Sequence, residues 1–454
     1  MAIGLRLPTA LSRAPLGFDD GVYLASAGAL RDGGLPFVDV YSSQGPAFLP
    51  LLWLADLLGL RTSVSPRLLP VAAGVALTIL VYAIALRVSD RAGAVIASLL
   101  VATSGCLLYS TSRIESDGVA MAFAAGAVLA ASRPGVRREG VAAVLLGVAV
   151  SVKSLLVAPA GLAVLWIIGR RRGWRPAALV GVASAGVLVA LSLPWGLRAV
   201  WDQSILLHLD ATEGFDVSAN RELVYWGLRH RDRLLLATAA VTVVWSVVRA
   251  VAGGRRPLRA EPASPGAADL HVALWIWMLG SAAVLVGHQP LFLQHLAVVV
   301  PPAALLVAMH RPPVVVIVAV AVLLLPSHGA GAQWRRTPVA PEADQRAAID
   351  LLRRIEPRSG MVISDAAELA WLARRTSPGW VVDVSFVRIG AGQLTTDDVV
   401  SAAHAPGVCA VLIWSQRLGY LPGLRADLTD YRAVFRRDDQ ELWLRDGCRL
   451  AARP

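Results

Sequence analysis

Long apolar runs fill most of the chain up to about residue 327, and short charged segments separate them. A helix needs roughly 20 apolar residues to cross a bilayer, and about 17 is the lower end. Several runs are shorter, so we expect some helices to extend into their flanks. The pattern predicts an α-helical polytopic membrane bundle with about ten membrane helices. The runs are Leu68–Leu86, Ala92–Tyr109, Ser116–Ala131, Gly140–Val152, Leu155–Ile168, Pro176–Val200, Leu234–Val251, Leu270–Gly287, Leu291–Met309 and Pro313–Leu325.

The segment before these runs does not fit a crossing. Gly45–Leu60 holds about 16 residues, fewer than an unstrained span needs, and counting it as a span would reverse the side of every later loop. We expect a juxtamembrane helix in the membrane interface. Met1–Phe18 is also too short to span. We therefore expect a first membrane helix that precedes this reading frame.

Arginine-rich loops set the predicted orientation, because cytoplasmic loops collect Lys and Arg. They alternate with loops poorer in charge only if Gly140–Ile168 contains two crossings that meet near Lys153, where Pro159 also favours a break. The residues before Leu68, Lys153 and the C-terminal region then lie on the extracytoplasmic face. The predicted cytoplasmic loops are Arg87–Arg91, Arg133–Arg138, Arg170–Arg175, Arg249–Arg259 and His310–Arg311.

The pattern changes after Leu325. A linker, Gly329–Pro341, is followed by alternating helical and strand periods, which predict a small α/β domain with a partly parallel sheet. We divide the chain into a first extracytoplasmic loop (1–67), a transmembrane bundle (68–327) and an extracytoplasmic α/β domain (328–454). The predicted helices are Glu342–Ile355, Ala366–Arg374 and Thr395–His404, and the predicted strands are Gly360–Ser364, Trp380–Val384, Val408–Trp414, Tyr431–Phe435 and Glu441–Leu444.

Composition supports the membrane assignment. Of the 454 residues, 56% are hydrophobic and 17% are charged, whereas a soluble globular protein carries about a quarter charged residues. This excludes a disordered chain, a collagen and an ordinary soluble enzyme. The net charge of +11 is mostly arginine on the predicted cytoplasmic loops, so it indicates orientation and contact with anionic lipid rather than nucleic-acid binding.

The cysteines and the C-terminal aspartates say little about function. Cys409 and Cys448 either pair in an oxidising compartment or stay as free thiols. There is no CxxC motif, so a structural zinc site is not indicated. Asp365 and Asp383 each follow a predicted strand, where turn and cap roles are the commoner use of aspartate.

Charged residues on the predicted outer face are the candidates for chemistry. Paired carboxylates such as Asp19 and Asp20 can act as a general base or bind a cation, although Asp before a helix is often a cap. Lys153 is the single lysine, and an ionisable residue at membrane depth is costly and usually functional. Its ammonium suits a phosphate, and snorkelling to the interface is the alternative. Further candidates are Arg113, Glu115 and Asp117 at a helix start, His288 and His295 at a membrane edge, and a possible lid formed by the loop Trp201–Arg233.

Taken in order, these features resemble a known family pattern: an acidic pair with a following tyrosine, a Gly–Pro step before a juxtamembrane helix, an arginine that opens the next helix, a second acidic site and a helix-breaking lysine. The matching segments are Asp19-Asp20-Gly21-Val22-Tyr23-Leu24-Ala25, Tyr41-Ser42-Ser43-Gln44-Gly45-Pro46, Arg67-Leu68-Leu69-Pro70, Glu115-Ser116-Asp117 and Lys153.

This set is similar to the GT-C superfamily of polytopic glycosyltransferases, and more narrowly to bacterial relatives of protein O-mannosyltransferases and lipid A aminoarabinose transferase. The resemblance covers roughly residues 17–310. Two departures stand out: the usual second acid is Glu, where this chain has Asp20, and the expected first membrane helix is missing before Asp19.

The resemblance implies an enzyme of the bacterial cell membrane that takes a sugar from a polyprenyl-phosphate donor. The sugar would pass, with inversion, to an extracytoplasmic lipid, glycan or protein. Asp19 would be the general base, and Asp20, Glu115 and Asp117 would shape the sugar site or hold a divalent cation, Mg²⁺ or Mn²⁺. Lys153, with Arg113, His288 and His295, would bind the leaving phosphate.

Two other classes of function remain open at this point. A transporter or flippase of a lipid-linked sugar or another anion also explains many helices and an intramembrane lysine. It explains the acidic pair and the appended α/β domain less well. An inactive scaffold whose outer domain binds a partner is the third class.

Overall fold

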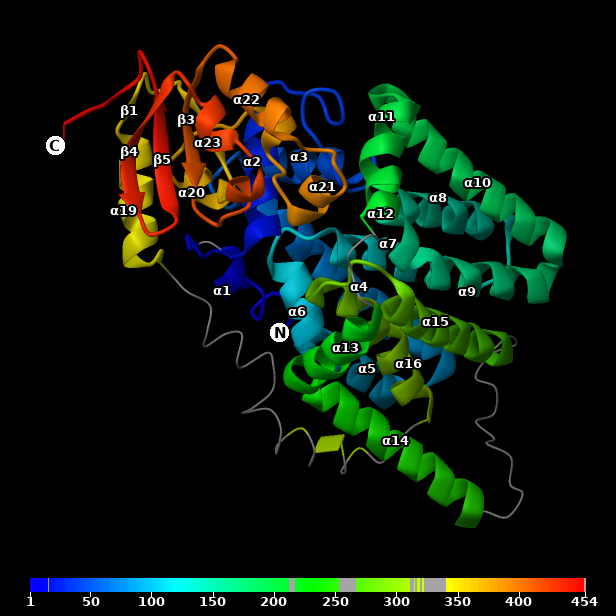
Figure 1. Ribbon diagram of the computed structural model, residues 1–454. Helices are drawn as coiled ribbons and strands as arrows, with labels where there is room; N and C mark the ends of the chain where they lie inside the picture. Colours follow the sequence, from blue (N-terminus) through cyan, green and yellow to red (C-terminus); the bar gives the residue numbers. More distant parts are fainter. Residues whose placement is uncertain are drawn as a thin grey trace. The chain divides into compact units, whose positions relative to one another are not determined.

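The computed structural model describes residues 1–14, 16–211, 217–252, 267–310 and 340–452, together with Val314, Ile317, Val318 and Ala321. These residues form two compact units (Figure 1). The first, called here the helical unit, holds Met1–Ala10, Leu69–Leu191 and the described part of Asp216–Thr337. The second, called here the mixed unit, holds Leu11–Leu68, Ser192–Phe215 and the described part of Pro338–Pro454.

The helical unit is built from apolar helices of unequal length. Among the described residues, five helical segments are long and apolar enough to cross a membrane, or up to six if the bent pair α5–α6, angled at 59°, is one span. The helical nature of the bundle is confirmed, and the number ten stays a prediction. The run Pro313–Leu325 lies almost wholly outside the described residues. The five segments are Ser65–Val88, Ser154–Arg172, Trp174–Trp195, Ala268–Gly287 and Leu293–His310.

Most helix bounds follow the predicted runs, with three main exceptions: Ala92–Tyr109 is divided between α5 and α6, Pro176–Val200 continues past α10 into η2 and α11, and α13 lies in the segment predicted as a loop. The helices are α1 (Leu7–Ala10), α4 (Leu68–Val88), α5 (Arg91–Thr103), α6 (Gly105–Ser112), α7 (Ser116–Ala131), α8 (Val136–Val152), α9 (Ser154–Arg172), α10 (Trp174–Ser192), α13 (Val217–Arg231), α14 (Arg233–Ala252), α15 (Ala267–Gly287), the 3₁₀ segment η4 (Leu293–Val299) and α16 (Val300–His310).

One local prediction about this bundle can be compared with the structure. The predicted break near Lys153 is confirmed: α8 ends at Val152, α9 begins at Ser154, and Lys153 between them has extended backbone angles. Pro159, expected to favour the break, instead lies inside α9. The prolines Pro301 and Pro302 do not break a helix. They lie in the first turn of α16, where a missing N–H leaves no intrahelical bond unmade.

The mixed unit begins with helix α2 (Phe18–Arg31), continues through α3 (Phe48–Leu58) and ends its first segment with the 3₁₀ turn η1 (Ser65–Arg67). Helix α3 confirms the helix expected within Gly45–Leu60. A short second segment carries η2 (Leu193–Trp195), α11 (Leu197–Trp201), the π-helical turn η3 (Asp202–Leu206) and α12 (Leu207–Asp210).

The C-terminal part of the mixed unit is an α/β structure, as predicted. Its four-stranded sheet has the order β2-β3-β5-β4, with β2 parallel to β3 and the other neighbours antiparallel. Strands β1 and β6 form a separate antiparallel pair. The elements are α19 (Ala343–Arg353), β1 (Ile355–Glu356), β2 (Met361–Ser364), α20 (Ala367–Leu372), η6 (Gly379–Val381), α21 (Phe386–Gly390), α22 (Thr396–His404), β3 (Val408–Ile413), η7 (Leu418–Tyr420), α23 (Leu424–Asp427), β4 (Tyr431–Arg437), β5 (Gln440–Arg445) and β6 (Arg449–Leu450).

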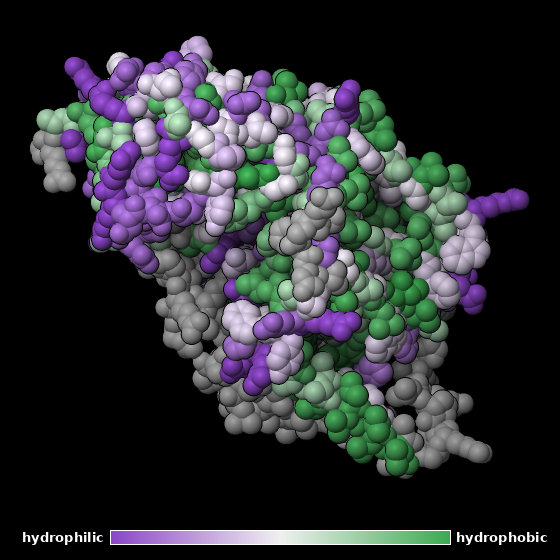
Figure 2. All heavy atoms as spheres, in the orientation of Figure 1, coloured by the Kyte–Doolittle hydropathy of each residue, from purple (hydrophilic) through white to green (hydrophobic). Residues whose placement is uncertain are grey.

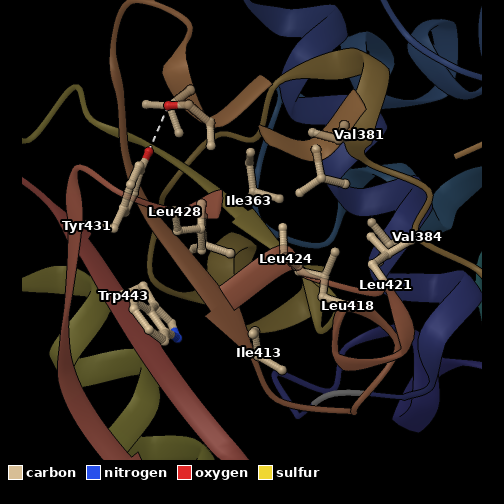
Figure 3. Close-up of a cluster of buried hydrophobic side chains, with 14 of the residues drawn as sticks. Ile363, Val381, Val384, Ile413, Leu418, Leu421, Leu424, Leu428, Tyr431 and Trp443 are labelled. Carbon is tan, nitrogen blue, oxygen red and sulfur yellow. Dashed lines mark hydrogen bonds between the residues drawn. The ribbon is translucent and has the colours of Figure 1, made fainter. Parts of the chain in front are cut away.

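Alternation along the strands gives this sheet two buried faces. Val411 and Ile413 of β3 belong to one apolar cluster, which α22 covers and Figure 3 shows. Ala410 and Leu412 belong to a second cluster, which α19 and α20 cover. In the first cluster the hydroxyl of Tyr431 donates to the carbonyl of Ala403 at 2.7 Å (Figure 3). Helices on both faces make this a three-layer α/β arrangement.

One predicted strand in this domain is wrong. Trp380–Val384 has the apolar composition of a buried strand, but the structure has the 3₁₀ turn η6 there and no strand over these residues. Pro378 precedes the turn, and Asp383 Oδ1 accepts the N–H of Ser385 at 2.9 Å. Short apolar runs do not distinguish a strand from other buried segments, and Pro and Asp favour turns.

A disulfide and a buried aspartate link separate segments of this domain. Cys409 and Cys448 form a disulfide, with their Cα atoms 5.7 Å apart. Asp365, just after β2, accepts N–H bonds from Trp414 at 2.7 Å, Ser415 at 3.0 Å and Leu418 at 3.2 Å. This aspartate therefore holds the loop after β3, as the predicted turn role implies.

The surface reflects the composition of the units. On the face shown in Figure 2, hydrophobic residues cover α14, whereas hydrophilic residues gather over the C-terminal sheet. Val243, Val244 and Val247 of α14 are among its exposed apolar side chains. Exposed apolar surface of this kind is expected where a helix contacts lipid.

Candidate functional site

The acidic pair lies in the first turn of α2. Gly17 is the N-cap residue, with a φ of 141°, and the helix begins at Phe18. Asp19 is half-buried and Asp20 is buried. Neither aspartate is the cap itself, so the capping alternative does not apply. Negative charge in the first turn interacts favourably with the helix dipole.

The carboxylate of Asp20 is paired with Arg67 of η1. Nη2 of Arg67 lies 2.6 Å from Oδ2 of Asp20, and its Nε donates to Oδ1 at 3.3 Å. Arg67 also donates to the carbonyl of Ser12 at 2.6 Å. Both side chains are buried, with 4% and 1% of their surface exposed. A bidentate, charge-assisted pair of this kind fixes geometry strongly.

The α/β domain contributes a cation to the surroundings of Asp19. Arg417, in the loop that Asp365 holds, lies over the ring of Phe18 at 3.9 Å and donates to the hydroxyl of Ser415 at 2.7 Å. Its guanidinium interacts electrostatically with Asp19, while burial is the main cause that lowers its pKa. Arginine keeps its charge despite such a shift, so the first turn of α2 faces a cation.

A second charged cluster lies in the helical unit. Oδ2 of Asp117, in the first turn of α7, is 3.2 Å from Nζ of Lys153. Oδ1 of the same carboxylate is 4.0 Å from Nε2 of His295. The Asp117 side chain is fully buried, and that of Lys153 is 14% exposed. Lys153 is thus a partly accessible cation beside a carboxylate.

The other predicted residues of the helical unit lie at the ends of its helices. Glu115 is the buried N-cap residue of α7. Arg113 lies 4.4 Å from the centre of the Tyr109 ring. The rings of His288 and His295 are 5.2 Å apart. Burial first, and Lys153 second, lower the pKa of His288 to about 4, so this imidazole is neutral at physiological pH.

The structure therefore groups the predicted residues within two units. Asp19 and Asp20 lie in the mixed unit, and the remaining six lie in the helical unit. Of the loop Trp201–Arg233, residues 212–216 lie outside the described residues; the rest forms α11, η3, α12 and α13.

The first turn of α2, with Asp19 and Asp20, is called here the acidic site. Three of its neighbours were not among the predicted site residues: Arg67, Arg417 and Glu368 of α20, which packs against Gly21. Arg67 was noted only as the residue that opens a helix. Glu368 interrupts an apolar helix, Ala-Glu-Leu-Ala-Trp-Leu, which is a detectable signal. Nothing in the sequence near Arg417 indicates that it meets α2.

Metal binding has limited support from the geometry. Across the described residues, no three His, Cys, Asp or Glu side chains converge as a metal site. The carboxylate best placed for one, Asp117, already has an ammonium 3.2 Å away.

No family model matches the sequence, and no curated protein matches it significantly. Solved structures do match. ArnT from Cupriavidus metallidurans, bound to undecaprenyl phosphate, is 14% identical, with a TM-score of 0.61 over 98% of this chain and 97% of that one. The oligosaccharyltransferase AglB from Archaeoglobus fulgidus, in complex with an inhibitory peptide and a dolichol-phosphate, is 13% identical, with a TM-score of 0.55 over 95% of this chain and 72% of that one. The same archaeal enzyme in complex with Zn and sulfate is 16% identical, with a TM-score of 0.55.

At identities of 13–16%, the TM-scores establish a shared fold but no shared reaction. Both proteins are glycosyltransferases of the GT-C superfamily. The match extends over nearly the whole chain, including the C-terminal α/β domain. This chain therefore shares its fold with ArnT and AglB, and the fold that the sequence resemblance implied is confirmed.

Proposed function

We propose that this protein is a membrane glycosyltransferase that moves a sugar from a polyprenyl-phosphate donor to an acceptor hydroxyl. The observation that carries the proposal is the fold shared with ArnT over 98% of the chain, because that protein was crystallised with undecaprenyl phosphate. The two charged clusters supply the groups such a transfer needs: a carboxylate for the acceptor and a cation for the phosphate.

Asp19 is the proposed general base. It takes the proton of the acceptor hydroxyl while the acceptor oxygen bonds to the anomeric carbon and the bond from that carbon to the phosphate oxygen breaks. The electron pair leaves with polyprenyl phosphate. A single base with no enzyme nucleophile gives inversion. Asp20 is unsuited to this role, because Arg67 engages both of its oxygens; we assign it to holding the first turn of α2.

Lys153 is the proposed ligand of the leaving phosphate. An ammonium has three N–H donors, and in the described part of the chain one carboxylate, Asp117, contacts it. The remaining donors are available to phosphate oxygens. The neutral imidazole of His288 offers a hydrogen bond without charge. His295 lies 4.0 Å from Asp117, and Arg113 is a further proposed ligand.

A divalent cation does not fit this cluster. Hard cations require several oxygen ligands close together, whereas the ammonium of Lys153 already neutralises Asp117. We therefore propose that transfer needs no resident Mg²⁺ or Mn²⁺.

The active face is proposed to be extracytoplasmic in a bacterial cell membrane. The arginine-rich loops predict this orientation, and the Cys409–Cys448 disulfide is typical of an oxidising compartment. The acceptor would be a lipid, a glycan or a protein with an exposed hydroxyl.

The test is a transfer assay with purified protein in detergent or proteoliposomes. Polyprenyl-phosphate hexoses and pentoses are the donors, and a membrane extract supplies acceptors. Release of polyprenyl phosphate is expected with the wild type and with Asp32→Asn, an exposed carboxylate at the other end of α2, but not with Asp19→Asn. Movement of intact donor across the bilayer without cleavage would instead support a transporter.

A further inference from the structure

Helix α20 of the α/β domain packs directly on the acidic turn of α2. A Cβ atom added to Gly21 would lie 2.8 Å from the backbone nitrogen of Glu368 and 3.1 Å from its Cβ, and would also meet Oε2 of that side chain. Real Cβ atoms do not approach so closely. Two turns further on, a Cβ at Gly28 would lie 3.5 Å from the Trp371 ring. Gly21 therefore lets α20 approach α2 beside the acidic pair, whereas Gly28 leaves room for a methyl group.

This contact brings the carboxyl group of Glu368 into the acidic site. Its Oε2 is buried and has no hydrogen-bond partner among the residues that the structure describes. The backbone N–H of Glu368 favours the charged form, but the buried Oε2 has no donor from any described residue, and a buried carboxylate that is not fully hydrogen-bonded usually becomes the neutral acid. Burial is the largest cause that raises the pKa of Glu368, to about 7; the charge of Asp20 raises it further, and Arg417 opposes this.

Each element packed around Glu368 contributes a charged side chain. Helix α2 supplies Asp20, the loop after β2 supplies Asp365, and the loop after β3 supplies Arg417. Arg67 and Arg13 line the small cavity that Glu368 also borders. Ionisation of Glu368 would therefore place a third carboxylate beside Asp20 and Asp365.

We infer that Glu368 is a positioning residue for the acidic turn of α2, and that it does this in its protonated form. The neutral side chain fits against Gly21 and supports the turn that carries Asp19. When Glu368 ionises, its carboxylate is repelled by Asp20 and Asp365 and requires hydration. Both effects move α20 away from α2. The C-terminal domain thus makes the acidic site sensitive to pH. This inference rests on the proposed role of Asp19 in transfer.

The sign of the effect on stability follows from linkage. In the unfolded chain Glu368 ionises near its ordinary pKa of 4.5, and in the folded chain near 7. Between these values the folded state binds more protons, so the free energy of unfolding decreases as pH rises. The stabilisation is complete below about pH 4.5 and is lost by the time the pH passes 7.

The test compares the full-length wild type with Glu368→Gln, which keeps the shape and the neutral charge, and with Glu356→Gln. Glu356 pairs with Arg449 at the surface and serves as the matched control. The first readout is the infrared band of protonated carboxyl groups between pH 5.5 and 8.5. We expect a band that disappears near pH 7 in the wild type and in Glu356→Gln, and is absent from Glu368→Gln.

The second readout is the apparent melting temperature in detergent over the same pH range. The wild type should lose several degrees relative to Glu368→Gln as the pH rises. The third is the transfer rate, which should fall roughly tenfold between pH 6 and pH 8 in the wild type, as the protonated fraction of a group with a pKa near 7 does, but not in Glu368→Gln.

Two outcomes would overturn the inference: no infrared band assigned to Glu368, or identical pH profiles of melting for Glu368→Gln and Glu356→Gln. If Glu368→Gln fails to fold, Glu368→Asp replaces it; this variant keeps an ionisable group, and its infrared band should titrate at a shifted midpoint. If no donor is cleaved by any variant, the proposed function fails, while the infrared and melting data still decide the state of Glu368.

Discussion

The Arg67–Asp20 and Lys153–Asp117 ion pairs are built differently. In the mixed unit, Arg67 engages both oxygens of Asp20 and a backbone carbonyl. In the helical unit, Lys153 makes one contact to Asp117, whose Oδ1 has no hydrogen-bond partner in the described residues. A guanidinium that is fully engaged holds structure, whereas an ammonium with remaining donors can receive a ligand. Charge alone does not distinguish a structural pair from a binding site.

The largest effect on stability should come from breaking the Arg67–Asp20 pair. Arg67→Ala leaves the carboxylate of Asp20 buried without its partner, which typically costs about 3–5 kcal/mol. We expect the apparent melting temperature in detergent to fall by many degrees, or folded protein to be lost. Arg61→Ala, an exposed arginine in the preceding loop, is the control and should melt like the wild type. Equal melting of the two variants would show that Asp20 does not need Arg67.

Breaking the Lys153–Asp117 pair should reduce stability less. Lys153→Met also leaves a buried carboxylate, Asp117, without its partner. Because Lys153 is 14% exposed, whereas Arg67 is 4% exposed, we expect water to replace the ammonium, and the cost should be nearer that of a lost hydrogen bond to a charged group, roughly 1.5–3 kcal/mol. Combining Lys153→Met with Asp117→Asn should restore part of the loss, since the orphaned charge is then removed. Thermal unfolding of the two single variants and the double variant measures the coupling. A loss as large as that of Arg67→Ala would contradict the difference between the pairs.

The glycine contact predicts a still smaller difference on α2. Gly21→Ala forces a Cβ against Glu368 and should cost about 1–3 kcal/mol, as overpacking does. Gly28→Ala meets Trp371 at an ordinary distance of 3.5 Å, and should be neutral or stabilising, because alanine favours helix by roughly 1 kcal/mol over glycine. Melting temperatures of the two variants compare them directly. A greater loss at Gly28 would mean that α20 does not pack on α2 as described.

Chelation should have the smallest effect. Because an ammonium already neutralises Asp117, we expect EDTA to leave both the melting temperature and the transfer rate unchanged. Added Mg²⁺ or Mn²⁺ should not raise the rate. Loss of activity on chelation, with recovery on adding a divalent cation, would show a metal site that the Asp117–Lys153 geometry does not provide.

Much of the fold could be predicted from the sequence, because local patterns determine it. The predicted strand 360–364 and helix 395–404 lie within a residue of β2 and α22. The break at Lys153 also followed from its charge. The strand predicted at Trp380–Val384 was wrong, because a short apolar run can also form a buried turn.

The candidate site was less predictable, because its contacts join distant parts of the chain. The acidic pair and Lys153 were identified as unusual charges. The approach of Glu368 to Gly21 depends on tertiary packing, and no spacing in the sequence encodes it. The pairing of Arg67 with both oxygens of Asp20 likewise depends on side-chain geometry, which the sequence does not show.

The central claim is that the acidic turn of α2 acts on the acceptor while the Lys153 cluster binds the donor phosphate. Binding of undecaprenyl phosphate to the wild type, Asp19→Asn and Lys153→Ala tests it directly, with undecaprenol as the phosphate-free control. We predict that Asp19→Asn binds like the wild type and that Lys153→Ala binds at least about tenfold more weakly, as expected for one charged hydrogen bond. Equal weakening in both variants, or equal binding of undecaprenol, would contradict the claim.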